Sequence, residues 1–300
     1  MIYFRKYLLV TFLSLLMTNM LAAQQNEGTA DSSEKVEKSK SKKKKRKKYK
    51  LPEIDLSHWK VTIPVGKPTE VGPPEILDYA NNQELKPFMY NDSTSGAIVF
   101  YAYPNTSTAN SSYSRSELRE QMVPGDNSVN WTFAQGGRMK GRLAMDEVTK
   151  DKNGNYHKVI VMQIHGRLTN EQRDLIGQKD NNAPPMLKIY WQDGKVRVKT
   201  KVLKDPGLSG NDLLHEEAWT DDEGYTFKQE VGFRPFTLEV NVEPGKMVVS
   251  LNNQEFAVYD DVSIKKWEIF ENYFKAGNYF QTKDKDAHAA VKYFELEVSH

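Results

Sequence analysis

The chain after residue 50 consists largely of short segments in which apolar and polar residues alternate. This alternation with a period of two predicts β-strands that bury one face and expose the other. Turn-forming pairs such as Asn153-Gly154 and Asp193-Gly194 separate many of these segments, as expected for hairpins. The predicted strands are Ala97–Ala102, Ser114–Met122, Arg138–Met145, Lys158–Ile164, Met186–Trp191, Lys195–Val202, Thr226–Glu230, Phe236–Val242, Lys246–Leu251, Gln254–Val258, Asn272–Tyr279 and Ala290–Val298.

Helical periodicity is scarce in the same region. Glu75–Tyr79 and Ser263–Ile269 are predicted to form short helical turns. No internal repeat and no Pro/Ser-rich linker divides residues 51–300. We therefore predict one all-β domain in which two antiparallel sheets pack as a sandwich or jelly roll.

The first 23 residues have the pattern of a signal peptide. Arg5 and Lys6 precede an apolar run that ends at Ala22-Ala23, where small residues allow cleavage. The alternative is a membrane anchor, but four polar residues interrupt the run, and it is short for a bilayer span. We expect the protein to be secreted, to an extracellular or periplasmic location, after cleavage near Ala23.

Residues 24–50 are polar and end in a lysine-rich run. Such a segment buries too little apolar surface to offset its chain entropy, so it is predicted to be disordered. Two interpretations stay open: a solvated linker, or a basic arm that contacts an anionic polymer or the cell surface. The export signal argues against a nucleic-acid partner.

The overall charge of +2 hides a division between the two parts of the chain. Residues 1–50 contain 13 Lys/Arg against 4 Asp/Glu, so residues 51–300 carry a net charge of −7. The chain has no cysteine, which excludes a disulfide framework, a cysteine zinc site and a cysteine nucleophile. With 38% hydrophobic and 27% charged residues, the composition is typical of a soluble globular protein.

Three predicted strands carry an unusual polar face. In the strand Ser114–Met122, the alternation of side chains places Arg115, Glu117 and Arg119 on one face. Two guanidinium groups around one carboxylate can form a fixed fork for carboxylates or hydroxyls. A row of solvent-exposed ion pairs is the structural alternative.

The strand Lys158–Ile164 continues to Gly166 and becomes polar towards its end. A histidine and an amide two residues apart on one face are candidates for proton transfer and hydrogen-bond donation. By alternation, Val159, Val161, Gln163 and His165 share one face, and Ile160, Met162 and Ile164 share the opposite, core face.

The segment Asn272–Gln281 has the third such face. A glycine in mid-strand indicates a place where a ligand can approach the backbone closely. By alternation, one face holds Tyr273, Lys275, Gly277, Tyr279 and Gln281, and the core face holds Phe274, Ala276 and Phe280.

A sandwich with a concave outer face would bring the three polar faces together in one groove. That groove would be cationic although its domain is acidic, which favours an anionic ligand with several carboxylates.

The segments SRSELRE, QIH and YFKAGNYFQ resemble, in order and spacing, the three signature blocks of alginate lyases of polysaccharide lyase family 7. The segment Ile54–Pro64 is similar to the start of that domain, so the resemblance covers essentially Leu51–His300. It implies a concanavalin-like β-jelly roll whose concave groove binds alginate, an anionic polysaccharide. It also implies cleavage by β-elimination, which leaves an unsaturated uronate end.

The resemblance also implies roles for individual residues. Arg115 and Gln163 would neutralise the substrate carboxylate, and His165 would assist them or act as the base. Tyr279 would protonate the leaving oxygen. Isoleucine at position 164 goes with cleavage of guluronate-containing blocks. The residues implied to line the groove and bind substrate are Glu117, Arg119, Lys275 and Gln281.

Other functional classes fit the residues less well. A glycoside hydrolase needs two carboxylates on either side of the bond, whereas Glu117 is the only acid on the three faces. A non-catalytic protein that binds acidic polysaccharides on the same fold is the main alternative.

No cofactor is expected, because His157 and His165 lack the spacing of a metal motif. The acidic loop Asp221–Glu223 leaves a structural calcium ion open as an alternative to a solvated turn. We expect a monomer.

Overall fold

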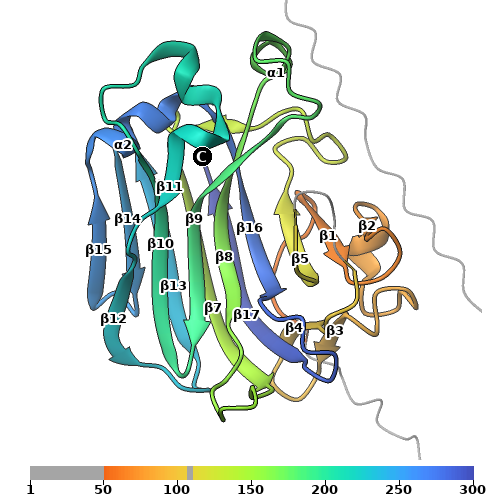
Figure 1. Ribbon diagram of the computed structural model, residues 1–300. Helices are drawn as coiled ribbons and strands as arrows, with labels where there is room; N and C mark the ends of the chain where they lie inside the picture. Colours follow the sequence, from red (N-terminus) through yellow and green to blue (C-terminus); the bar gives the residue numbers. More distant parts are fainter. Residues whose placement is uncertain (1–50, 107–110) are drawn as a thin grey trace, which may run out of the picture. The chain divides into compact units, whose positions relative to one another are not determined.

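The computed structural model describes residues 51–106 and 111–300, which form two antiparallel β-sheets stacked face to face (Figure 1). The predicted all-β sandwich is therefore confirmed. The predicted signal peptide and basic arm lie outside the described residues. In the described part of the chain, no helix is both long enough and apolar enough to cross a bilayer.

The first sheet carries the three polar faces on neighbouring strands. Its strands follow the order β11-β10-β9-β8-β16-β5-β1-β2, with β12 paired to β10 and β6 paired to β16. Their bounds are β1 (Trp59–Ile63), β2 (Thr69–Val71), β5 (Arg115–Glu120), β6 (Trp131–Thr132), β8 (Val159–Arg167), β9 (Asn182–Gln192), β10 (Lys195–Leu203), β11 (Trp219–Asp221), β12 (Tyr225–Glu230) and β16 (Glu271–Phe280).

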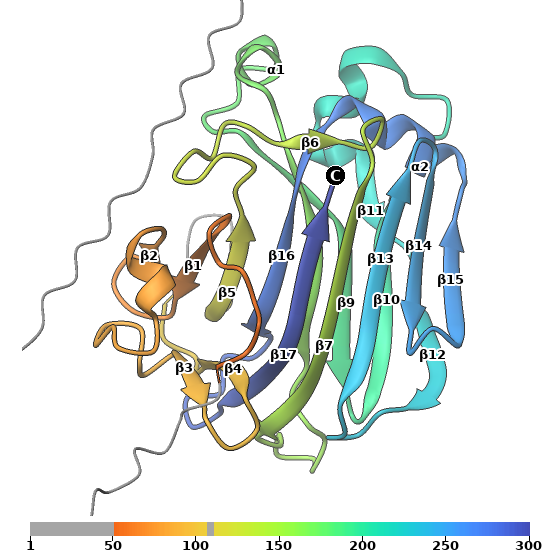
Figure 2. The same ribbon diagram turned by 180° about the vertical axis from the view of Figure 1, so that it is seen from behind.

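The second sheet covers the inner side of the first, and Figure 2 shows it from behind. Its order is β15-β14-β13-β7-β17-β4-β3. Its strands are β3 (Met89–Asp92), β4 (Ala97–Ala102), β7 (Gly137–Val148), β13 (Phe236–Glu243), β14 (Lys246–Leu251), β15 (Glu255–Tyr259) and β17 (Ala289–Ser299). The helices are α1 (Asn170–Leu175) and α2 (Val262–Lys266), with 3-10 turns at Glu75–Asp78, Gly210–Leu214, Glu216–Ala218 and Trp267–Ile269.

All twelve predicted strands are present, with bounds that differ by up to four residues, and both predicted helical turns are found. Five strands were not predicted: β1, β2, β3, β6 and β11. Four of them have only two to four residues, too few to show a period. β1 does alternate, since Trp59, Val61 and Ile63 are buried between partly exposed neighbours.

Apolar side chains from both sheets meet in one core. Each large side chain buried there contributes about 1.5–3 kcal/mol of hydrophobic free energy. The core therefore fixes which face of each strand of the first sheet remains outside. The central members are Leu118, Met162, Ile164, Phe274 and Ala276 from the first sheet, and Phe100, Leu143 and Tyr293 from the second.

The predicted faces of β8 are correct only after residue 161. The pairing of β8 with β9 shifts between Ile160 and Met162, so one extra residue is inserted there as a β-bulge. Val161 and the following Met162 both lie in the core, and the Tyr293 hydroxyl donates to the Val161 carbonyl at 2.5 Å. Val159 and Val161 therefore face the core, contrary to the alternation, and Ile160 lies opposite Tyr279.

A second register shift lies beside the first, between Ala276 and Tyr279 of β16. As a result, neighbouring strands use different numbers of residues between the same two sets of paired positions. Lys275 and Tyr279 are four positions apart on β16, and their partners Gln163 and Ile160 are three apart on β8. On β9 the corresponding residues, Lys188 and Tyr190, are two apart. This stretch therefore contains the most residues on β16 and β5, where the polar side chains are concentrated.

Candidate active site

A buried carboxylate lies at the centre of the three polar faces. The side chain of Glu117 is 0% exposed, and its oxygens accept from Lys275 Nζ at 2.5 Å, from Gln163 Nε2 at 2.5 Å and from Arg115 at 3.4 Å. Glu117 was predicted to line the groove and bind substrate. The structure places it beneath them, where it holds three donors in fixed positions.

The strand register explains why these four groups meet. Gly277 lies opposite Glu117 on β5, and Lys275 lies opposite Gln163 on β8. Opposite residues in an antiparallel pair project from the same face, so the four positions converge although they come from three strands.

Arg115 and Tyr279 form one end of the site. The Arg115 guanidinium lies over the Tyr279 ring, 4.0 Å from its centroid. Ser111, which the sequence analysis did not single out, connects the two side chains. Its hydroxyl donates to the Tyr113 carbonyl at 3.0 Å, and its oxygen accepts from Arg115 and lies 3.0 Å from the Tyr279 hydroxyl. Because the only Ser111 hydroxyl proton is used, Tyr279 is the donor in that last contact.

His165 lies at the opposite end, on the same face. Its ring stacks on Tyr273 with centroids 5.2 Å apart, and Nδ1 lies 2.9 Å from the Gly166 carbonyl. A carbonyl only accepts, so Nδ1 carries the proton and Nε2 keeps its lone pair. Burial, with the charge of Lys275, lowers the pKa of His165 to about 3. His165 is therefore a neutral imidazole, as a base requires.

The two arginines of the SRSELRE segment have different surroundings. Arg119 is 7% exposed and lies over the Tyr273 ring, 4.1 Å from the centroid. It donates to the Glu120 and Asn127 carbonyls and to Asn130 Oδ1, at 2.6, 3.0 and 2.9 Å. The protein already satisfies most donors of Arg119. Arg115, beside Tyr279, is therefore the better candidate for binding a reacting carboxylate.

Gly277 serves packing rather than ligand access. Its φ is +137°, and a Cβ there would lie 2.7 Å from the Ser116 carbonyl oxygen and 2.9 Å from Glu117 Cα. The expected close approach therefore exists, but the backbone of β5 makes it, not a ligand. It brings Glu117 close under β16.

Gln281 follows the end of β16, and its amide donates to the Tyr279 carbonyl at 3.3 Å. It does not line the cavity described below. A role of Gln281 in binding stays a prediction.

A cavity of about 670 Å³ opens over the part of this face between Arg115 and His165 and extends beyond His165. Gln163 and Tyr279 do not line it. Its lining is mostly basic and amide side chains, which suits an anion with hydroxyl groups. The lining residues that the sequence analysis did not identify include Lys60, Lys67, Ser111, Asn127, Arg167 and Asn182. Three of them lie in loops, Lys60 lies on the unpredicted strand β1, and Arg167 and Asn182 lie at strand ends beyond the predicted bounds. No predicted alternation therefore marked them in advance.

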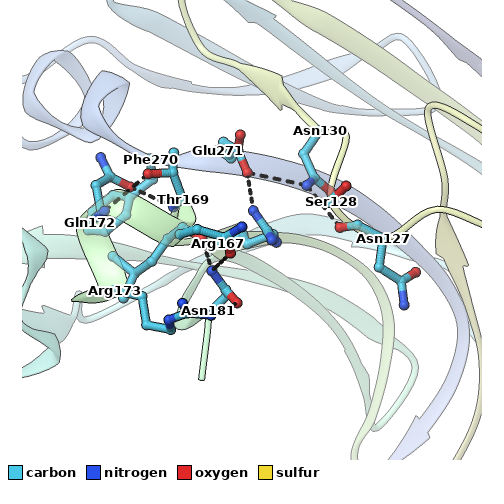
Figure 3. A network of polar contacts seen from close by, with 12 residues as sticks. Asn127, Ser128, Asn130, Arg167, Thr169, Gln172, Arg173, Asn181, Phe270 and Glu271 are labelled. Atoms are coloured by element: carbon cyan, nitrogen blue, oxygen red, sulfur yellow. Dashed lines mark hydrogen bonds and ion pairs between the residues drawn. The ribbon is translucent and has the colours of Figure 1, made fainter. Parts of the chain in front are cut away.

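Glu271 joins the loops at the far end of this cavity (Figure 3). It accepts from Arg167 at 2.5 Å and from Asn130 at 3.3 Å. The neighbouring loop contains α1, whose first turn is closed by reciprocal hydrogen bonds between Thr169 and Gln172. Gln172 also donates to the Ile269 carbonyl at 2.7 Å. Hydrogen bonds and an ion pair thus hold the loops at this end of the cavity to one another and to β16.

No metal site is found in the described residues, since nowhere in 51–106 or 111–300 do three His, Asp or Glu side chains gather around one point. In the acidic loop, Asp221 binds Lys188 at 2.6 Å and Lys201 at 3.0 Å. These lysines occupy the carboxylate that a calcium ion would need.

Comparison with known proteins gives a consistent result. The profile of a family described as alginate lyase matches residues 54–300. None of the curated proteins compared matches the chain. Among solved structures, alginate lyase A1-II′, a member of polysaccharide lyase family 7, is 31% identical; the match covers 82% of this chain and 96% of that chain, with a TM-score of 0.63.

Two further structures are relevant. A variant of A1-II′ with one histidine changed to asparagine and one tyrosine to phenylalanine, in complex with a substrate written GGMG, is 30% identical; 82% of this chain and 94% of that chain are covered, with a TM-score of 0.63. An alginate lyase from Pseudomonas aeruginosa is 24% identical over 82% of this chain and 99% of that chain, with a TM-score of 0.60, and shows the same fold.

Proposed function

The chain belongs to the alginate lyases of polysaccharide lyase family 7, and from this premise we propose that it is a secreted enzyme that cleaves alginate by β-elimination, with a preference for guluronate-containing blocks. Export rests on the signal-peptide pattern of residues 1–23. The substrate preference rests on the residues of the site.

The reaction makes specific demands on a site. A base must remove the C-5 proton next to the uronate carboxylate, and an acid must protonate the C-4 oxygen as it leaves. Negative charge builds up on the carboxylate, so fixed positive charges and hydrogen-bond donors must surround it. A neutral imidazole and a phenol on one sheet face, with cations held between them, meet these demands, and this combination carries the proposal.

Each residue then has a defined task. Arg115 and the second amide hydrogen of Gln163 bind the carboxylate, while Glu117 holds both donors in place. His165 Nε2 takes the C-5 proton, and the Tyr279 hydroxyl gives a proton to the leaving oxygen. Lys275, Arg119 and Gln281 bind the neighbouring sugars.

The preference for guluronate follows from two separate proton-transfer groups. Guluronate presents its C-5 proton on the ring face opposite the leaving oxygen, so base and acid must be different residues. Ile164 is fully buried, on the face opposite Gln163 and His165, and we propose that its side chain sets their height. The relatives support this proposal, because one A1-II′ variant binds a product written GGG and another the substrate GGMG, both of which contain G residues.

The function is tested by incubating the full chain with alginate and following ultraviolet absorbance. Elimination creates a conjugated double bond between C-4 and C-5, so absorbance should rise as the polymer shortens. Shortening without absorbance would indicate a hydrolase. Binding without either change would indicate the non-catalytic polysaccharide-binding protein.

The substrate preference is tested with the two homopolymers. The wild type should cleave polyguluronate faster than polymannuronate. His165→Ala should lose cleavage of polyguluronate more severely than cleavage of polymannuronate, for which Tyr279 can serve as both base and acid. Initial rates on both polymers decide the matter. A faster rate on polymannuronate would contradict the preference, and equal losses would contradict the separate roles.

The pH dependence should follow Lys275 rather than His165. Burial and the charge of Arg115 lower the pKa of Lys275 to about 8, so its positive charge disappears as the pH rises through 8. With the pKa of His165 near 3, the base is already neutral at pH 5. We expect kcat/KM to fall above about pH 8 and to show no decline between pH 7 and 5 that is due to His165. Lys275→Arg should move the alkaline decline upwards. A decline near pH 6.5 on the acid side would contradict this assignment.

Ser111 should act as a positioning residue. Ser111→Ala removes the oxygen that accepts from both Arg115 and Tyr279, so kcat should fall about 10-fold with a smaller change in KM. Ser111→Thr, which keeps the hydroxyl, should restore most of the rate. An effect on KM alone would limit Ser111 to substrate binding.

A further inference from the structure

Basic side chains continue beyond Gln163 on the same face of the first sheet. Lys188 of β9 lies opposite Gln163, and Lys199 of β10 lies opposite Lys188. These lysines had no predicted role, and neither lines the cavity over His165. In antiparallel pairs, opposite residues project from one face, so both lysines point to the side on which His165 and Tyr279 lie.

These lysines complete a row of hydrogen-bond donors across the sheet. The register places one donor on each of six neighbouring strands, in the order β1, β5, β16, β8, β9 and β10. With about 4.8 Å between strands, the row is about 24 Å long, which exceeds the length of two sugar rings. Its members are Lys60, Arg119, Lys275, Gln163, Lys188 and Lys199.

The lysine side chains of β9 and β10 lie close together around one carboxylate. Asp221 of β11 accepts from Lys188 at 2.6 Å and forms an ion pair with Lys201 at 3.0 Å, so one carboxylate holds two ammonium groups together. Both lysine side chains are only 14% exposed. Lys199 adds a third positive charge. The pKa of Lys188 is lowered mainly by burial, and the nearby charges of Lys201 and Lys199 lower it further. On this face the three lysines thus surround one carboxylate, whereas the neighbouring Asp222 accepts from Thr200.

We propose that Lys188 and Lys199 form a binding site for additional uronate carboxylates of the polymer, on the β9–β10 side of the reacting bond. This inference rests on the proposed function. A 4-linked polyuronate carries one carboxylate on each ring, and the ring length is close to the strand spacing of about 4.8 Å. A polymer that crosses the strands would therefore bring successive carboxylates near successive donors of the row.

The chemistry of lysine defines what this site distinguishes. An ammonium group is a compact point charge on a flexible stem, and it lacks the planar fork with which arginine fixes a carboxylate. The site should therefore detect charge and chain length, and it should bind guluronate and mannuronate about equally. Stereochemical selection stays with Gln163, His165 and Tyr279.

The proposal is tested with Lys199→Ala, because Lys199 can be removed without exposing a buried partner. kcat/KM is measured on uronate oligomers of increasing length and on both homopolymers, and the midpoint of thermal unfolding is recorded. The loss should be small on a trisaccharide and reach about 3- to 10-fold on the polymers, to a similar extent for both. Lys246→Ala, at the exposed start of β14 in the other sheet, is the matched control and should change nothing at any length.

Binding is measured separately by retardation in gels that contain alginate, in low and high salt. Lys199→Ala should be retarded less than the wild type at low salt, and the difference should shrink as salt increases. Lys188→Ala, accepted only if its unfolding midpoint is unchanged, should behave in the same way. Equal losses at all lengths, no loss, or unaltered retardation would overturn the proposal. An inactive wild type that is still retarded would contradict the lyase function and leave the binding site intact.

Discussion

Replacing Tyr279 by phenylalanine should lower kcat on alginate by about 10²- to 10⁴-fold, the usual contribution of one proton-transfer group. The change removes the hydroxyl that donates to Ser111 and leaves the ring under Arg115. Binding should therefore survive, and retardation in alginate gels should match the wild type. The rate is measured as the increase in ultraviolet absorbance under saturating polymer.

Tyr273→Phe provides the matched control, because Tyr273 lies on the same strand and face but stacks on His165. It removes the same atom from a ring that we assign no proton transfer, so its effect should be far smaller. If Tyr279→Phe retains more than about a tenth of the rate, or if both variants lose equally, Tyr279 is not the acid.

Replacing Glu117 by alanine should lower the free energy of unfolding by about 3–5 kcal/mol, as expected when one partner of a buried ion pair is removed. Lys275 and Arg115 would lose their counter-ion, and the Gln163 amide would lose its acceptor, all beneath the sheet surface. Activity should be lost as well, because the donors would no longer be held in place. Unfolding in urea, followed by intrinsic fluorescence, measures the first effect.

Glu70→Ala is the comparison for this experiment. Glu70 pairs with Lys60 at 2.6 Å, but its side chain is 53% exposed, and solvent screens such a pair. Its removal should cost less than about 1 kcal/mol. If Glu117→Ala is as harmless as Glu70→Ala, the central carboxylate does not organise the site.

The sequence predicted the architecture and the polar faces well where one face of a strand is clearly apolar. Arg115, Glu117 and Arg119 alternate with Ser116 and Leu118, so their shared face could be inferred directly. β8 was different, because residues 159–162 are all apolar. Alternation has no meaning in such a run, and the bulge at Val161 left no signal there.

The burial of Glu117 was also beyond prediction from the sequence. A carboxylate is seldom fully buried, and its partner Gln163 lies 46 residues away on another strand. Ser111 was missed for a related reason. It lies outside any predicted strand, and its link to Tyr279 spans 168 residues. Contacts of this kind depend on the completed sheet register, which local pattern does not contain.

The paired register shifts have a consequence for any attempt to transplant this site. Its geometry depends on the number of residues between Ile160 and Gln163 as much as on their identities. Deleting Val161 would return β8 to regular pairing with β9 but would widen its mismatch with β16. A one-residue slip also moves side chains to the opposite face. Either Gln163 and His165 would then face the core, or the residues before them on β8 would face outwards. A designer who grafts the QIH segment onto another sheet must therefore carry the extra residue with it, together with a hydroxyl such as that of Tyr293 to satisfy its carbonyl.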